Sequence, residues 1–227
     1  TAMPTALPTP TPAPTWWSQP DATNLQLWLR ADSLSCASGD AVGSWSDGSS
    51  NGYTASQNAS GYQPECTGSL SALNGYPAVR FGESSVTMLT LGANPIYATG
   101  TGLTVFAVVA NVDGDMDSRL FDEGFVANRG VGLQLSGASV IMYTPTSHGG
   151  AYTESAFAID GAGHVISMRI TFGSDQTAWV DGSQACDATI TTSALSSTQV
   201  AWASVASTAS GPFTIGAQSK SYNQASR

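Results

Sequence analysis

The sequence predicts an all-β domain built from short antiparallel strands, and three observations lead to this prediction. Only 10% of the 227 residues are charged and 24 are glycine, a composition typical of strands and tight turns rather than of helices. Apolar and polar residues alternate along several segments that are bounded by Asn-Gly and Asp-Gly dipeptides. No segment shows a sustained 3.6-residue periodicity. A chain of this length can bury a substantial core as one domain.

The first residues differ in composition from the rest. Residues 1–15 alternate threonine with proline, a pattern that favours extended polyproline II and cannot pack a core. We therefore expect residues 1–17 to form a linker or tail, ending at Trp16 and Trp17, and residues 18–227 to form the domain.

The first expected strand is Leu25 to Ala31. Its leucines fall on one face of an extended strand, whereas Gln26, Trp28 and Arg30 fall on the other, which predicts a half-buried strand. Trp28, Trp45 and Trp179 are expected to pack in the core or between sheets, as tryptophan usually does.

The middle of the chain contains a long apolar run. Leu103 to Ala110 is apolar on both faces, which predicts a central strand that is covered on both sides. Val131–Leu135 and Ser139–Tyr143 flank Gly137 and predict a hairpin.

The last third of the chain gives the clearest alternation. In the segment Val165 to Phe172, the residues expected to point inward are Ile166, Met168, Ile170 and Phe172. A turn then leads to a strand over Thr177–Gly182, a second turn leads back through Ala185–Ile190, and Phe213–Gly216 is the last strand signal. The alternation predicts a sandwich or a barrel, and spacing alone does not choose between them.

Several short motifs together resemble one family. The order LWLRAD, SWSDGS, QP, NGYPAVRF, LTVFAVVA, ISMRITFGSDQTAWVDGSQ and PFTIGA, over residues 22–217, resembles the bacterial LamG-like jelly rolls, relatives of the concanavalin A-like lectins and glucanases. The resemblance implies an antiparallel β-sandwich of the jelly-roll, concanavalin A-like kind. It also implies a role in extracellular recognition.

The end of the chain departs from the resembled family. Its members continue past the TIG strand into a closing strand beside the first strand, and residues 218–227 do not read as a buried strand. We therefore expect the closing strand to be missing because of truncation, because of cleavage after Arg227, or because another chain donates it. The open edge at Leu25–Ala31 would then be filled in trans or by Thr1–Trp17 folding back.

The charge excludes some partners. The formal net charge is −9 and the seven cations are scattered, whereas binding to nucleic acid or to anionic lipid needs a basic patch. No apolar run approaches the roughly 20 residues of a membrane helix, so no membrane insertion is expected. Neutral glycans, surface proteins and divalent cations remain as partners.

The cysteines predict a disulfide rather than a metal site. Cys36, Cys66 and Cys186 form no C-x-x-C pair, which argues against zinc and thioredoxin-like chemistry. Cys36 and Cys66 flank the Trp45 turn and are expected to form a disulfide. The alternative is three buried thiols.

Catalytic patterns are missing from the sequence. The related glucanases use Glu-x-Asp-x-x-Glu, because glycoside hydrolysis needs a pair of carboxylates, and no glutamate here stands in that pattern. There is no G-x-S-x-G elbow. His148 and His164 are not spaced as metal ligands, and His164 is expected at the end of a strand. We therefore expect no enzyme activity.

Two loops are candidate binding sites. Asp113, Asp115 and Asp117 alternate in a short polar stretch, which suits an oxygen-rich Ca²⁺ site. The alternative is a solvated acidic turn. Tyr143, His148 and Tyr152 bracket a loop that could bind a sugar through aromatic faces, and the alternative is a connection whose tyrosines cap the core.

Three functions remain, in order of preference. The first is a non-catalytic carbohydrate-binding or adhesive module of a larger secreted or cell-surface protein. The second is a structural or assembly module of a surface fibre or virion. The third is a polysaccharide-degrading enzyme whose site the sequence does not reveal.

Overall fold

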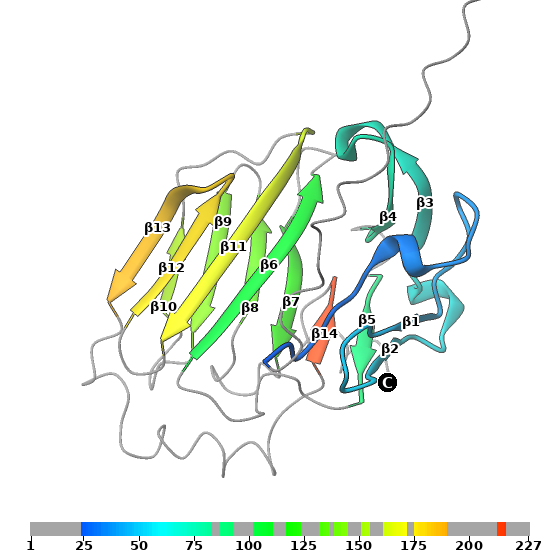
Figure 1. Ribbon diagram of the computed structural model, residues 1–227, viewed down its shortest axis with the longest axis horizontal. Helices are drawn as coiled ribbons and strands as arrows, with labels where there is room; N and C mark the ends of the chain where they lie inside the picture. The colour runs from blue at the N-terminus through cyan, green and yellow to red at the C-terminus, as the bar shows by residue number, and fades with distance from the viewer. Residues whose placement is uncertain are drawn as a thin grey trace, which may run out of the picture.

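A computed structural model describes residues 24–82, 87–92, 102–110, 117–123, 132–136, 139–144, 151–154, 161–171, 175–189 and 213–216. It confirms the prediction of an all-β antiparallel sandwich. Every ladder between the described strands is antiparallel. Figure 1 shows a four-stranded sheet lying in front of part of an eight-stranded sheet, with a small two-stranded sheet at one side.

The eight-stranded sheet gathers strands from the whole length of the chain, in the order β1-β2-β5-β14-β7-β8-β9-β10. The predicted hairpin around Gly137 is confirmed as β8 and β9, which pair from Gly132↔Tyr143 to Ser136↔Ser139. The strands are β1 (Ser44–Ser46), β2 (Thr54–Ser56), β5 (Leu89–Leu91), β7 (Asp117–Glu123), β8 (Gly132–Ser136), β9 (Ser139–Thr144), β10 (Ala151–Glu154) and β14 (Phe213–Ile215).

The four-stranded sheet has the order β13-β12-β11-β6, and the small sheet pairs β3 with β4. The strands β11, β12 and β13 follow one another as neighbours, as expected, and the second expected turn is confirmed at Asp181 and Gly182, whereas residues 172–174 lie outside the described residues. The elements are β6 (Gly102–Ala110), β11 (Gly163–Thr171), β12 (Asp175–Val180), β13 (Ser183–Thr189), β3 (Glu65–Leu70) and β4 (Tyr76–Arg80), with short 3-10 helices η1 (Ala31–Ser33), η2 (Ser60–Tyr62) and η3 (Ser71–Leu73).

Both large sheets contribute to one core. Ile166 and Met168 of β11 are fully buried, as the alternation predicted, and they share the core with Leu133 of β8. The rings of Phe121 and Phe213 stack with centroids 5.6 Å apart, which links β7 to β14 inside the same cluster. The side chain of Ile170 and the whole of Phe172 lie outside the described parts.

The last described strand, β14, lies in the middle of its sheet rather than at an edge. It pairs with β5 on one side and with β7 on the other. Directly after it, Gly216 has φ +89°, and a β-carbon there would fall on the ring of Phe81. Only glycine meets both conditions, so Gly216 closes the core at the end of β14.

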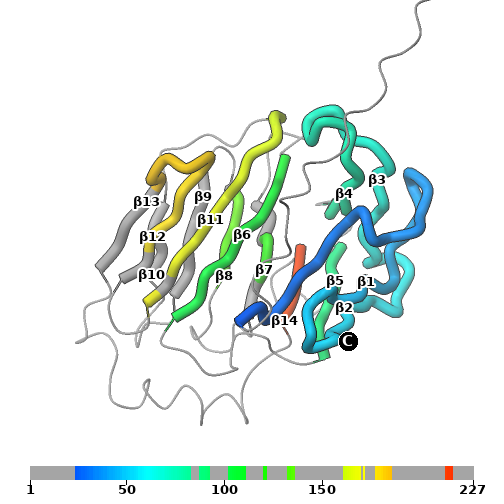
Figure 2. Tube along the Cα trace, in the orientation of Figure 1, coloured from blue at the N-terminus to red at the C-terminus, as the bar shows by residue number. Residues whose placement is uncertain are grey.

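The expectation that Leu25–Ala31 forms a strand is wrong. Residues 25–30 are extended but belong to no described ladder, and η1 begins at Ala31. The alternation is nevertheless meaningful, because Leu27 and Leu29 pack against the core. Figure 2 shows the segment in blue, running toward η1 beside β1 and β2.

Side chains from the following turn bond to the backbone of this segment. Asp47 Oδ1 accepts a hydrogen bond from the Trp28 amide at 2.7 Å, and the Gly48 amide donates to the Trp28 carbonyl at 2.8 Å. Asn51 Nδ2 donates to the carbonyls of Leu25 and Gln26, at 3.2 and 3.0 Å. Within the described residues, therefore, polar groups of this edge are paired in cis, and the expected strand from another chain is not needed for them. Thr1–Trp17 lies outside the described residues.

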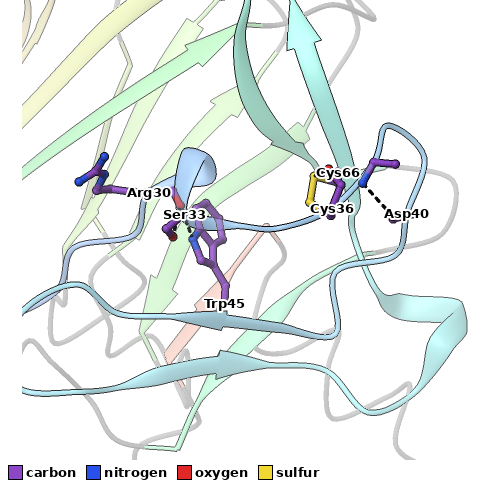
Figure 3. Close-up of a disulfide and its surroundings, with 7 residues drawn as sticks. Arg30, Ser33, Cys36, Asp40, Trp45 and Cys66 are labelled. Carbon is purple, nitrogen blue, oxygen red and sulfur yellow. Dashed lines mark hydrogen bonds between the residues drawn. A yellow bond between two sulfur atoms is a disulfide. The ribbon is translucent and has the colours of Figure 1, made fainter. Parts of the chain in front are cut away.

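The disulfide between Cys36 and Cys66 is confirmed. It ties the segment after η1 to β3, near the indole of Trp45 (Figure 3). Trp45 is buried, as expected, and its Nε1 donates to the Arg30 carbonyl at 2.9 Å. The indole holds the N-terminal segment against β1, and the disulfide holds the segment after η1 against β3. The side chain of Cys186, in β13, is not among those described.

The expectation that Leu103–Ala110 is covered on both sides is also wrong. β6 is the edge strand of the four-stranded sheet among the described strands. Its side chains alternate between partly buried and exposed, so one face packs on the core and the other faces solvent. Apolar residues on both faces therefore signal an exposed apolar surface here, and not a central strand.

Candidate outer-face binding site

The exposed apolar residues of β6 and β11 form one patch. Phe106 and Val108 of β6 are 74% and 66% exposed, and Val165 of β11 is 48% exposed. Val165 is the Cα partner of Val108, and Phe106 is two residues from Val108 on the same face. We call Phe106, Val108 and Val165 the outer patch. Exposed contiguous apolar surface of this kind makes the outer patch a candidate interaction site.

A row of side chains crosses the sheet from the outer patch. The register pairs Phe106 with Ser167, Ser167 with Trp179, and Trp179 with Gln184. Ala178 and Val180 are buried in the core, so Trp179 between them points to the outer face. We call these four residues, Phe106, Ser167, Trp179 and Gln184, the outer row.

An arginine lies beside the second ring of the outer row. The guanidinium carbon of Arg169 is 5.9 Å from the centroid of the Trp179 ring, a cation–π distance. The expectation that Trp179 packs in the core is therefore wrong. Its ring lies partly exposed on the outer face, where an aromatic platform stands next to a planar hydrogen-bond donor.

A hydrogen bond joins His164 to Asp181 near the start of β11, where His164 alternates with Val165 and so lies on the same face as the buried Ile166. Nδ1 of His164 lies 2.7 Å from Oδ2 of Asp181, and Oδ1 accepts the Val165 amide at 2.8 Å. The bond to His164, followed by the bond to the Val165 amide, holds the pKa of Asp181 below its ordinary value. His164 is the second residue of β11, so its expected place at a strand end is confirmed. The pair fixes the turn between β12 and β13 against β11.

The predicted sugar-binding residues lie on another part of the fold. Tyr143 of β9 and Tyr152 of β10 are Cα partners in the ladder at the edge of the eight-stranded sheet, so the backbone brings these two positions together. His148 lies outside the described residues. The tyrosine site therefore stays a prediction.

The predicted calcium site also stays a prediction. Asp117 is the first residue of β7 and pairs with Ser136, whereas Asp113 and Asp115 lie outside the described residues. In the described parts of the chain, no three His, Cys, Asp or Glu side chains gather closely enough to hold a metal ion.

Several of the described aspartates stabilise local structure. Asp32 pairs with Arg30 at 2.6 Å, and that interaction holds the pKa of Asp32 below its ordinary value. Asp40 accepts the Ala37 amide, and Asp47 bonds the Trp28 amide. These carboxylates satisfy neighbouring donors in the loops around β1, away from the outer patch.

The apolar run of β6 stands out in the sequence, but it predicts burial of both faces and the outward face is exposed. The outward residues of β6 are apolar, and apolar residues on both faces of a strand usually indicate a strand that is covered on both sides. The signal that distinguishes the two cases is the neighbouring strand, because β11 carries Val165, Ser167 and Arg169 on the same face. Because polar outward residues on β11 indicate that this face of the sheet is exposed to solvent, the same face of the neighbouring strand β6 is exposed too.

Comparison with known proteins adds a distant structural similarity. No family model and no curated protein matches the sequence. Among solved structures, the binding domain of botulinum neurotoxin serotype C1 matches with a TM-score of 0.45 at 10% identity, over 79% of this chain and 42% of that one.

Two further neurotoxin structures match in the same way. One is a structure of botulinum neurotoxin type C, whose cell entry depends on interaction with two ganglioside molecules. It matches with a TM-score of 0.44 at 10% identity, over 79% of this chain and 42% of that one. The other is the binding domain of botulinum neurotoxin DC in complex with rat synaptotagmin II (TM-score 0.40, 10% identity, 71% and 41% coverage). The chain spans less than half the length of each of these structures, and the toxins' binding properties do not transfer to it at this similarity.

The described residues contain no helix that is long and apolar enough to span a membrane.

Proposed function

We propose that this chain is a non-catalytic recognition module of a secreted or cell-surface protein, and that it binds carbohydrate on the outer face of the four-stranded sheet. The observation that carries this proposal is the exposure of Phe106, at 74%, on a face that also bears Trp179 and Arg169. Aromatic rings bind the C–H faces of sugars, and planar polar side chains bind their hydroxyl groups.

A non-catalytic role is supported by the carboxylates. The sequence lacks the Glu-x-Asp-x-x-Glu pattern of the related glucanases, and hydrolysis of a glycosidic bond needs two carboxylates on either side of it. Asp181, in the turn after β12, is engaged by His164 and by the Val165 amide.

An extracellular location is supported by two features. The Cys36–Cys66 disulfide suits an oxidising compartment. The Thr/Pro-rich start of the chain has the composition of linkers between domains of secreted proteins.

The test is retention of the full chain on insoluble polysaccharides and on a glycan array, with and without calcium. We expect binding to at least one glycan. Binding that disappears in chelator would assign the predicted Asp113, Asp115 and Asp117 site a part in it. A complete chain that binds no glycan with calcium present would contradict the proposal.

An assembly module is the second candidate, and β6 is the observation that favours it. Among the described strands, this nine-residue strand lies at an edge and carries no charge and no proline, and such edges invite pairing with another chain. Light scattering across a concentration series is the test. Growth in mass with concentration would favour assembly, and a monomer at high concentration would count against it.

A further inference from the structure

We infer that the ligand of the outer face is an uncharged, extended polysaccharide that lies across the strands, along the outer row from Phe106 to Gln184. This inference rests on the proposed function and adds to it the ligand class, the direction of binding and the residues that set both. Nothing in the sequence alone placed these four residues together, because they come from four different strands.

The register gives the row its direction. Phe106, Ser167 and Trp179 are successive Cα partners on neighbouring strands, and strands lie about 4.8 Å apart. Two strand spacings therefore separate the two aromatic residues by roughly 9–10 Å. Alternate sugars of an extended chain are separated by a similar length, so one sugar can stack on each ring. The intervening sugar then lies over Ser167, whose small side chain leaves room for it.

Polar groups along the row suit hydroxyl groups. The Ser167 hydroxyl and the exposed Gln184 amide can each donate and accept hydrogen bonds, as a sugar hydroxyl does. Arg169 lies beside the Trp179 ring and adds a cation–π contact to this part of the row. The row therefore offers apolar and polar contacts alternately, in the order ring, hydroxyl, ring, amide.

The other direction, along the strands, offers less. Beyond Phe106 on β6 lies Val108, with Val165 beside it on β11. The next outward positions are Ala110 on β6 and Gly163 on β11, which are Cα partners. An extended sugar chain along β6 would meet aliphatic side chains and one ring. The valines instead form an apolar border to one side of the row.

Charge and area argue for an uncharged sugar over a protein or an anionic polymer. The chain carries a formal net charge of −9, so both a second copy and an anionic polysaccharide are repelled. The three side chains of the outer patch expose on the order of 300 Å². A stable protein interface buries about 800 Å² on each partner, whereas a short stretch of a polysaccharide needs a smaller contact area.

The test starts from the full chain and an uncharged panel of insoluble cellulose, xylan and β-1,3-glucan, with alginate as the anionic comparison. Soluble oligosaccharides of the retained polymer are then titrated by calorimetry. We expect the tetrasaccharide to bind on the order of tenfold more tightly than the disaccharide, because only the longer sugar contacts both rings.

Variants test the row directly. Phe106→Ala and Trp179→Ala should each weaken binding on the order of tenfold, whereas Phe106→Tyr and Trp179→Phe keep a ring and should bind within a few-fold of the wild type. Tyr76→Ala is the matched control, because Tyr76 is an aromatic residue of β4, on the small sheet, and is 66% exposed. Unchanged melting temperatures for Phe106→Ala and Tyr76→Ala check that both variants fold.

The outcomes separate this inference from the function on which it rests. If the wild type binds and Phe106→Ala binds equally well, the outer row is wrong while carbohydrate binding stands, and Tyr143 and Tyr152 are the next site to test. Equal affinity for disaccharide and tetrasaccharide, or a preference for alginate, also overturns the inference. If the wild type binds none of the polymers or array glycans, the proposed function itself fails.

Discussion

Asp47 attaches the N-terminal segment to the turn between β1 and β2, and the change Asp47→Ala should therefore loosen this attachment. Its Oδ1 accepts the amides of Trp28 and Ser49 at 2.7 and 2.8 Å. Its Oδ2 accepts the Tyr53 amide at 3.4 Å and also bonds the Ser49 hydroxyl. One carboxylate therefore joins the extended segment to both sides of the turn between β1 and β2.

The expected loss of stability follows from the number of backbone donors that lose their acceptor in Asp47→Ala. A buried backbone donor without a partner costs about 1–3 kcal/mol. Asp47→Ala removes the acceptor of two close amides that are only partly buried, so water replaces part of the loss, and we expect a decrease of about 2–4 kcal/mol in the free energy of unfolding. Asp47→Asn keeps one oxygen for these amides and should cost about 1 kcal/mol.

Urea unfolding followed by tryptophan fluorescence measures these values. Asp40→Ala is the matched control, because Asp40 accepts one exposed bond, from the Ala37 amide, and should cost less than about 1 kcal/mol. Hydrogen exchange at the Trp28 amide should be faster than in the wild type in Asp47→Ala but not in Asp40→Ala. If Asp47→Ala unfolds at the same urea concentration as Asp40→Ala and Trp28 stays protected, the account of this segment is wrong.

Three further predictions concern other parts of the fold. The Cys36–Cys66 disulfide joins residues 30 positions apart. In the chain-entropy model, its reduction should lower the free energy of unfolding by about 3.5 kcal/mol. Coinciding urea unfolding curves of the oxidised and reduced protein would contradict this. Asp181→Asn should lower the stability at neutral pH and make the loss of stability toward acid pH less steep. A carboxylate with a lowered pKa stabilises the fold above its unfolded pKa of about 4 and loses this effect as the pH falls further. Thermal melts between about pH 2 and about pH 7 measure this effect, and parallel wild-type and variant profiles would refute it. Gly216→Ala should lower the free energy of unfolding by about 2 kcal/mol or more. Gly182→Ala is the control and should lower it by less, because Gly182 has a similar positive φ but open space around it. Equal melting temperatures of the two variants would show that crowding at Gly216 does not matter.

Much of the strand pattern could be predicted because alternation reports local burial. Ile166 and Met168 were assigned to the core on their spacing alone, and both are fully buried. The segment from Leu25 to Ala31 shows the limit of this reasoning. Its alternation correctly indicates which side chains face the core, but pairing is a property of a second segment. Here the partner is a set of side chains, from Asp47 and Asn51, that no strand pattern reveals.

The candidate site was harder to predict, for a related reason. Cys36 and Cys66 were paired from their position around one turn, whereas the outer row depends on the register of four strands. Phe106 and Trp179 are 73 positions apart in the sequence, and only the pairing through Ser167 brings them into one line. Local pattern assigned both rings to the interior, because aromatic residues usually are there.

Calorimetric titration of one uncharged oligosaccharide into the wild type, Phe106→Ala and Tyr76→Ala tests the central claim most directly. The ligand is the tetrasaccharide of whichever polymer retains the full chain. We expect wild type and Tyr76→Ala to bind with the same affinity and Phe106→Ala to bind on the order of tenfold more weakly. Equal affinities for all three folded proteins would contradict a binding site on the outer face of the four-stranded sheet.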